Sequence, residues 1–175
     1  MQGGAAMKLY HGSNMAVENP EIRKSAHTLD FGGGFYTTHN FEQAAEFARK
    51  VVRRSAKLAI LTGIATVSEY DFDLAVAEKT LKILKFEKPD VKWLEFVVGN
   101  RKNIHQESDY DVIIGPVAND DVYTTISYYE RGIIDAQATI KRLKVKKLFS
   151  QTLLKTEKAL KLLKFVKSVI IKQEN

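Results

Sequence analysis

The 175-residue sequence contains no cysteine. A disulfide framework and a thiolate metal site are therefore excluded, and the composition fits a reducing, cytoplasmic environment. No apolar run approaches the roughly 18 to 20 residues that cross a bilayer, and no signal peptide opens the chain, so we expect no membrane partner. The histidines have no metal-ligand spacing with carboxylates, and for this reason we expect no metal.

Only three prolines are present, and no repeat, low-complexity stretch or linker divides the chain. We therefore predict one domain over residues 7–175, long enough to bury a core. Residues 1–6, MQGGAA, precede a second methionine and are interpreted as an expression scar.

The net charge of +6 is uneven, because eleven basic residues lie between Lys141 and Lys172 and only Glu157 opposes them. Such asymmetry attracts an anionic partner such as nucleic acid, or it forms a solvated lysine-rich face.

The pattern of apolar residues and turn signals predicts strands interleaved with helices, which is typical of the α/β and α+β classes. Asn40 is a candidate N-cap for one helix. The segment 80–86 is compatible with either a helix or a strand. We predict strands at 8–11, 34–38, within 57–73, at 110–114, 148–154 and 165–171, and helices at 41–54, 89–99, 120–129, 135–143 and 156–163.

Two short motifs carry the strongest functional signal. Residues 9–13, LYHGS, bring a histidine, a glycine and a serine to the end of a strand. Residues 30–38, DFGGGFYTT, form a triple-glycine turn followed by an aromatic strand. Glycine lacks a Cβ, so a backbone or a ligand approaches it closely. The combination suits a flat, polar, nucleotide-like ligand.

These motifs resemble the first two signature elements of the ADP-ribosyltransferase superfamily, in its diphtheria-toxin and poly(ADP-ribose)-polymerase-like branch with a His-Tyr-Glu triad. From about residue 7 to 171 the chain is similar to a little-characterised bacterial group of that superfamily, associated with toxin-like and phage-defence systems. The resemblance implies an α+β fold of split antiparallel β-sheets with flanking helices and NAD in the cleft between them. Further matching stretches are 93–97, 100–101, 110–121 and 151–160.

The resemblance implies a role for each residue of the triad. His11 would hydrogen-bond the adenosine-side ribose, and Tyr36 would stack on the nicotinamide ring. Gln151 stands where the triad glutamate is expected, and it keeps an acceptor oxygen but loses the negative charge. Without the motif, a structural histidine and packing aromatics would explain the first two residues equally well. The cofactor-binding residues expected by resemblance are His11, Gly12, Ser13, Gly34, Phe35, Tyr36 and Arg101.

Other polar residues are further candidates, and some of them also have a structural interpretation. Arg101 could pair with the NAD pyrophosphate, because a guanidinium fork matches phosphate oxygens. Asp120 and Asp121 either act on the acceptor nucleophile or charge the start of a helix. Glu157 is a fallback carboxylate, although the first turn of a helix also explains it. Asn100 and Asp111 are polar neighbours of the Gly115-Pro116 turn.

The function expected from the resemblance is an NAD-dependent mono-ADP-ribosyltransferase, a toxin-like effector that modifies a protein or nucleic-acid acceptor. An antitoxin protein is a possible partner by resemblance. The alternative is a non-catalytic NAD- or nucleotide-binding module, which the glutamine at position 151 favours. A third reading is a nucleic-acid-binding protein that ignores NAD.

Overall fold

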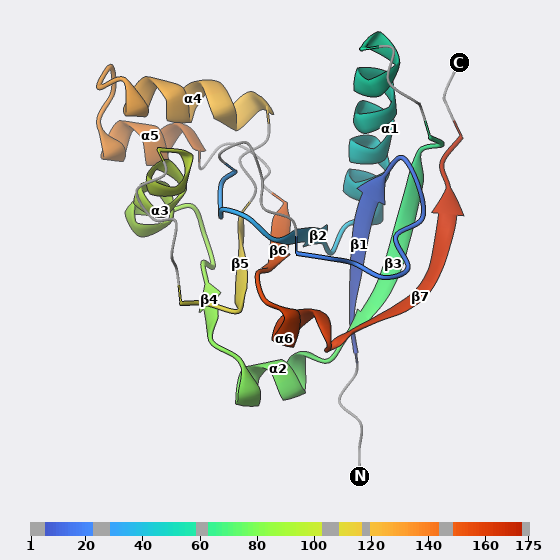
Figure 1. Cartoon of the computed structure of the whole chain (residues 1–175). Helices are drawn as coiled ribbons and strands as arrows, with labels where there is room; N and C mark the ends of the chain where they lie inside the picture. The colour runs from blue at the N-terminus through green and yellow to red at the C-terminus, as the bar shows by residue number, and fades with distance from the viewer. Residues whose placement is uncertain are drawn as a thin grey trace.

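The computed structural model describes residues 6–22, 29–58, 63–102, 109–116, 120–143 and 149–172. Within these ranges the strands form one mixed sheet in the order β4-β5-β6-β2-β1-β3-β7 (Figure 1). Every neighbouring pair is antiparallel except β4 and β5. The strands are β1 (Met7–Ser13), β2 (Phe35–Thr38), β3 (Thr66–Phe72), β4 (Ile83–Lys85), β5 (Val112–Pro116), β6 (Ser150–Leu154) and β7 (Leu163–Ile170).

Helices flank this sheet, and the expected α+β class is confirmed. The longest helix begins where the Asn40 side chain accepts a hydrogen bond from the Gln43 N–H at 2.9 Å, which confirms the predicted N-cap. The helices of the described residues are α1 (Phe41–Lys57), α2 (Leu74–Thr80), α3 (Val91–Arg101), α4 (Asp120–Glu130), α5 (Ala136–Leu143) and α6 (Glu157–Leu160).

The sheet is divided at the junction of β1 and β2. These strands share a single register pair, Tyr10 with Thr38, whereas β1 and β3 are paired over the whole of β1. Figure 1 accordingly shows β1, β3 and β7 on one side of the molecule and β4, β5 and β6 on the other, with β2 between them. The junction brings β1, β2 and β6 next to one another.

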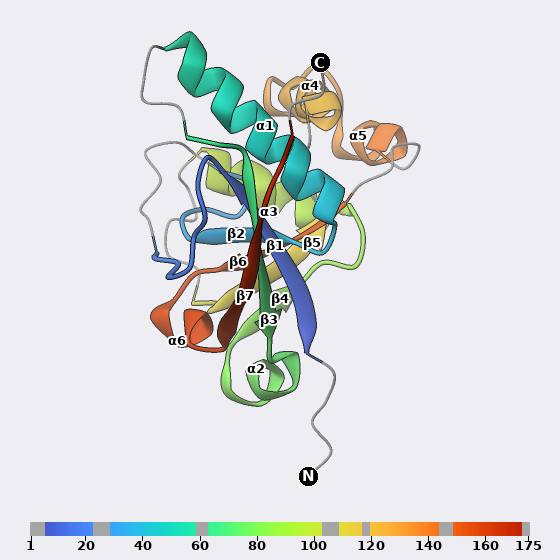
Figure 2. The same cartoon turned by 90° about the vertical axis from the view of Figure 1, so that its right-hand side faces the viewer.

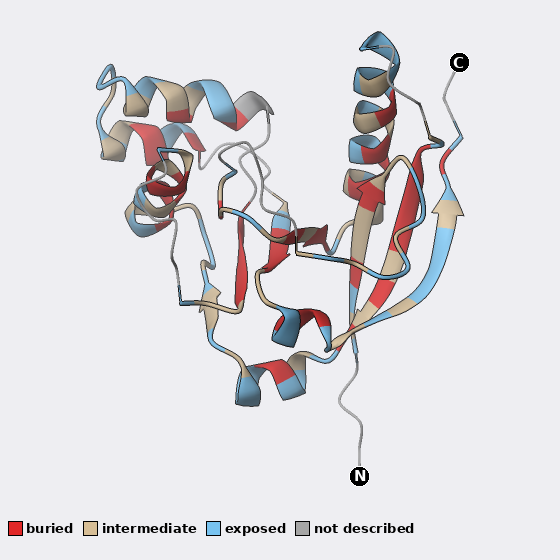
Figure 3. Cartoon of the chain, viewed as in Figure 1, coloured by how far each residue is buried: buried red, intermediate tan, exposed pale blue. Residues whose placement is uncertain are grey.

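Each half of the sheet has its own helical cover. Helix α1 packs its small residues Ala44, Ala45 and Ala48 against Val67 of β3 (Figure 2). Helices α3, α4 and α5 pack around Trp93 and cover β5 and β6. Figure 3 shows buried residues along β3, β5 and β6 and exposed ones along the outer strand β7. Burial of these apolar faces is the main stabilising contribution.

Several predicted elements differ from the structure. Helix α2 was not predicted. Its N-cap is Asp73, whose side chain accepts a hydrogen bond from the Val76 N–H at 3.0 Å. Gly99 is a buried residue inside α3 rather than at its end. Gly115 and Pro116 belong to β5 instead of ending it. The segment 80–86 resolves as the short strand β4, and the predicted helix at 156–163 is the single turn α6.

The prediction of β structure at 57–73 is also wrong in part. Lys57 is the last residue of α1, and the strand starts only at Thr66. Residues 1–5, His27, His105 and the lysines at 144, 146 and 147 lie outside the described residues. No helix of the described ranges is long and apolar enough to cross a membrane.

Candidate functional site

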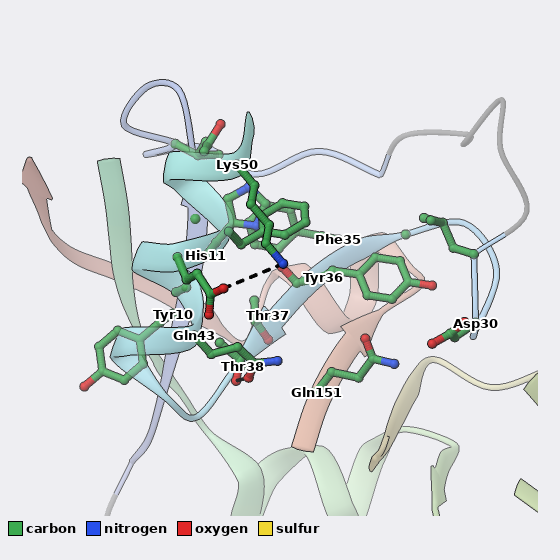
Figure 4. Close-up of a pocket in the computed structure, with 18 of the residues that line it drawn as sticks. Tyr10, His11, Asp30, Phe35, Tyr36, Thr37, Thr38, Gln43, Lys50 and Gln151 are labelled. Carbon is green, nitrogen blue, oxygen red and sulfur yellow. Dashed lines mark hydrogen bonds and ion pairs between the residues drawn. The ribbon is translucent and has the colours of Figure 1, made fainter. Parts of the chain in front are cut away.

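The three adjacent strands β1, β2 and β6 bring His11, Tyr36 and Gln151 to one cleft (Figure 4). The register pairs Thr38 with Gln151 across β2 and β6, and Tyr10 with Thr38 across β1 and β2. His11 and Tyr36 are 25 positions apart in the sequence, and Tyr36 and Gln151 are 115 positions apart. Strand pairing brings these distant residues together. The cleft has a volume of about 1500 Å³, which exceeds the ~300–1000 Å³ of typical small-ligand sites.

His11 is fixed by a contact with the backbone of β2. Its Nδ1 lies 2.8 Å from the carbonyl oxygen of Tyr36. Because a carbonyl only accepts, Nδ1 carries the proton, and in the neutral ring Nε2 is then an acceptor. The imidazole also packs on the Phe35 ring, with centroids 4.5 Å apart. The ring therefore has a defined orientation and tautomer.

Tyr36 holds the glycine turn closed through its hydroxyl group. The hydroxyl donates to the Gly32 carbonyl at 2.7 Å and accepts from the Phe31 N–H at 3.2 Å. Burial raises the pKa of the phenol well above its usual range, and the charge of Asp30 adds to the increase. The phenol is thus neutral at physiological pH. With the hydroxyl engaged in the turn, the aromatic ring is what remains for a ligand.

Phe35 and Tyr36 point to opposite faces of β2, as alternation along a strand requires. Phe35 is 6% exposed and packs edge-to-face on Tyr70, with ring centroids 5.8 Å apart. Tyr36 packs instead on the side of the Trp93 cluster. Both residues contribute to the cleft lining, but Phe35 is mainly a core residue.

Gln151 is the most unusual polar residue of the cleft. Its side chain is almost fully buried, and within the described part of the chain its Nε2 has no hydrogen-bond partner. Figure 4 shows the amide on the same side of β2 as the Tyr36 ring. Buried amides without a partner are rare in folded proteins, because desolvation costs about 1 to 3 kcal/mol. The unpaired amide nitrogen makes Gln151 a candidate for contact with a ligand.

Two glycines of the cleft are required by packing. A Cβ on Gly12 would lie 2.0 Å from the Ala44 carbonyl oxygen of α1. A Cβ on Gly34 would lie 2.6 Å from the Leu154 carbonyl oxygen, and its φ of +149° is itself unfavourable for other residues. Gly12 lets α1 approach β1, and Gly34 lets β6 approach β2. Both also line the cleft, together with Ser13.

Arg101 is held on the cleft by an ion pair that the sequence did not predict. Its Nε and Nη2 lie 2.9 and 2.8 Å from the same Asp30 oxygen, and both side chains are largely buried. The guanidinium also lies 4.8 Å from the centre of the Tyr123 ring. Its Nη1 is buried and has no partner among the described residues. In the sequence, only the position of Asp30 before the triple-glycine turn indicated a role for this residue.

The remaining polar candidates lie elsewhere or serve local structure. The Asn100 amide donates to the Phe96 carbonyl of its own helix at 2.9 Å. Asp111 accepts from the Lys82 N–H and the Thr156 hydroxyl, away from the cleft lining. Glu157 is exposed in the first turn of α6. The side chains of Asp120 and Asp121 lie outside the described residues.

One wall of the cleft was missed entirely at the sequence level. Helix α1 contributes Gln43, Phe47, Lys50 and Arg54, which recur at helical spacing along one face. The helix was predicted, but its position beside β1 depends on tertiary packing. Among the described residues no group of three or more metal-ligating side chains is present.

The structure defines a mixed α+β protein with a cleft of about 1500 Å³ at the junction of β1, β2 and β6. Residues 7–165 match the model of a family described as "Protein of unknown function (DUF3990)", and the chain belongs to this family. A search of the curated proteins found no match, and a search of the solved structures found none either.

Proposed function

We propose that this protein is an NAD-dependent mono-ADP-ribosyltransferase with a His-Tyr-Gln site built on a split-sheet ADP-ribosyltransferase fold. The observation that carries the proposal is the convergence of His11, Tyr36 and Gln151 on one cleft from three neighbouring strands. The division of the sheet at the junction of β1 and β2 supports the split-sheet architecture.

The residues of the cleft suit the parts of the dinucleotide. The imidazole of His11 hydrogen-bonds a ribose hydroxyl. The neutral Tyr36 ring stacks on the cationic nicotinamide, which is worth about 0.5 to 2 kcal/mol. Gln151 offers its amide to the hydroxyls of the second ribose. Arg101, kept in place by Asp30, directs a guanidinium N–H toward a phosphate oxygen.

The transfer breaks the bond between C1′ of the ribose and the nicotinamide nitrogen. Nicotinamide leaves with the electron pair of that bond, and a lone pair of the acceptor forms the new bond to C1′. The acceptor's proton passes to water. Gln151 stabilises the developing positive charge less than a glutamate would, so we expect a slow single transfer rather than polymer growth. The acceptor is a macromolecule, and an inhibitory partner protein is compatible with a toxin-like role.

A non-catalytic NAD-binding module is the second candidate. The observation that favours it is the uncharged Gln151 amide at the centre of the cleft. Such a module would bind NAD as a sensor and release no nicotinamide.

Labelled-NAD transfer into cell lysate separates the two functions, with the wild-type protein and the variants Gln151→Glu and Gln151→Leu compared side by side. For a transferase we expect labelled product with the wild type, at least equal product with Gln151→Glu, and a loss of about 100-fold with Gln151→Leu. NAD binding without product in both the wild type and Gln151→Glu would establish the module instead.

A further inference from the structure

The C-terminal half of α1 is strongly basic. After Glu46 the helix carries Arg49, Lys50, Arg53, Arg54 and Lys57 and no acidic residue. The apolar face of the helix packs on the sheet through Ala44, Ala48 and Val52, so most of these cations project away from the core. Lys50 (Figure 4) and Arg54, one helical turn apart, line the cleft.

An aromatic ring accompanies the cations on this wall. Phe47 lies one turn before Lys50, and it is 56% exposed although it is a large apolar residue. It belongs to none of the buried clusters of the described chain. Phe47 lines the cleft, so its exposed ring is accessible to a ligand bound there.

The other side of the cleft repeats this combination. Tyr123 of α4 is 57% exposed and lies under the guanidinium of Arg101. Lys102, the next residue after Arg101, also lines the cleft. Figure 1 shows α1 on one side of β2 and α3 and α4 on the other. Exposed rings with neighbouring cations thus flank the three proposed catalytic residues on both sides.

We propose that this cleft binds a single-stranded nucleic acid, which is the acceptor of the transfer. Rings that stack on bases, interleaved with cations that contact phosphates, are the arrangement by which proteins hold single strands without a helix-turn-helix or zinc finger. An acidic protein segment would use the cations of the cleft but leave Phe47 and Tyr123 without a role. The nucleic acid accounts for both groups.

The cleft is also lined by acidic residues, and two of them form ion pairs with its cations. Glu46 forms an ion pair with Lys50 at 3.7 Å, and Asp30 forms one with Arg101 at 2.8 Å. Glu18 and Glu21 lie on the segment that follows β1, which is a different wall from α1. A bound strand would therefore have to place its phosphates along α1 and away from Glu18 and Glu21. Glu130 lies at the end of α4.

The role as acceptor rests on the proposed transfer from NAD, but binding of the strand does not. A nitrogen or oxygen of the bound strand would form the bond to C1′, nicotinamide would leave, and the proton would go to water. The strand and NAD are therefore tested separately, so that one proposal is able to fail while the other stands.

Fluorescence anisotropy with a labelled single-stranded oligonucleotide of about 12 nucleotides, without NAD, measures the binding directly. We expect affinity that falls steeply between about 50 mM and 200 mM salt. The double variant Lys50→Gln/Arg54→Gln should lower the slope of log K against log salt by about 1.4, since each phosphate contact on a single strand contributes about 0.7. Phe47→Ala should weaken binding by about tenfold at constant slope, through loss of stacking.

A charge-matched control removes two exposed lysines that do not line the cleft, Lys161 and Lys164. Lys161→Gln/Lys164→Gln should bind the oligonucleotide like the wild type. The proposal is overturned by absence of binding at low salt, by equal loss in the control variant, or by a poly-glutamate peptide that competes as well as the oligonucleotide. NAD binding by calorimetry alongside any of these results would leave the transferase proposal intact.

Discussion

The imidazole Nδ1 of His11 lies 2.8 Å from the carbonyl oxygen of Tyr36, and this hydrogen bond spans the point where β1 and β2 share only one register pair. The sheet is therefore held together at its weakest junction by a residue of the candidate site. The same bond fixes the tautomer of the histidine that we assign to a ribose. One hydrogen bond therefore joins β1 to β2 and also orients a residue of the proposed binding site.

His11→Ala should weaken NAD binding by about tenfold, the equivalent of about one lost hydrogen bond of 1.4 kcal/mol. Isothermal calorimetry measures the change. The matched control is His39→Ala, because His39 lies 3.3 Å from the Thr152 hydroxyl and does not line the cleft. Equal affinities of His11→Ala and the wild type would contradict the assigned role.

Tyr36→Phe should lower the free energy of unfolding by about 1 to 2 kcal/mol while leaving the ring available for stacking. The hydroxyl satisfies both the Gly32 carbonyl and the Phe31 N–H of the glycine turn. Urea unfolding gives the stability, and NAD calorimetry gives the stacking. Tyr123→Phe, at an exposed ring, serves as the control. A Tyr36→Phe protein as stable as the wild type would show that the turn closes without the phenol.

Tyr36 also predicts a pH dependence at the alkaline end. Burial raises the pKa of the folded phenol above its unfolded value of about 10. Its contribution to stability is therefore complete below pH 10 and is lost as the pH rises toward the folded pKa. Wild-type stability should fall more steeply above pH 10 than that of Tyr36→Phe, as measured by urea unfolding across this range. Parallel curves would contradict the assigned environment.

Gly12→Ala should destabilise the protein by about 3 kcal/mol or more, because its Cβ would collide with the backbone of α1. Gly132→Ala is the comparison: its φ of +71° is strained, but nothing lies within 4 Å of the new Cβ. We expect a loss of only about 1 to 2 kcal/mol there. Thermal unfolding of both variants decides the matter. Similar losses would mean that α1 adjusts easily.

Asp111→Asn should destabilise the protein at neutral pH by about 1 kcal/mol and remove part of its acid sensitivity. Burial raises the pKa of this carboxyl, but hydrogen bonds from the Lys82 N–H and the Thr156 hydroxyl, with the charges of Lys158 and Lys82, lower it overall. A lowered pKa gives stability that is present above about pH 3.9 and is lost as the pH falls through the folded value. The stability difference between the two proteins should therefore shrink below pH 4.

The sequence predicted the elements that carry local signals. Asn40 capped its helix as expected, and the glycine turn led into the aromatic strand β2. Helix α2 was missed because its seven residues give too little periodicity beside a β-rich segment. Gly99 and Gly115 were taken as ends of elements, yet Gly99 is buried inside α3 and Gly115 lies within β5, where a Cβ would come within 3.1 Å of the Phe31 and Phe86 side chains.

The parts of the site that depend on long-range pairing were not predictable. Asp30 and Arg101 are 71 residues apart, and only the packing of α3 beside the glycine turn makes them partners. Helix α1 forms a wall of the cleft only because Gly12 has no Cβ, which lets the helix pack closely against β1. The parallel pairing of β4 with β5 likewise has no signature in a three-residue strand.

The most direct test compares NAD affinity and stability in Gln151→Leu. Because the Gln151 Nε2 is buried without a partner among the described residues, leucine should leave the free energy of unfolding equal or raise it by up to about 1 kcal/mol. Calorimetry should at the same time show NAD binding to the wild type and an affinity at least about tenfold lower in the variant. No heat of NAD binding to the wild type, or the same affinity in both proteins, would contradict the account.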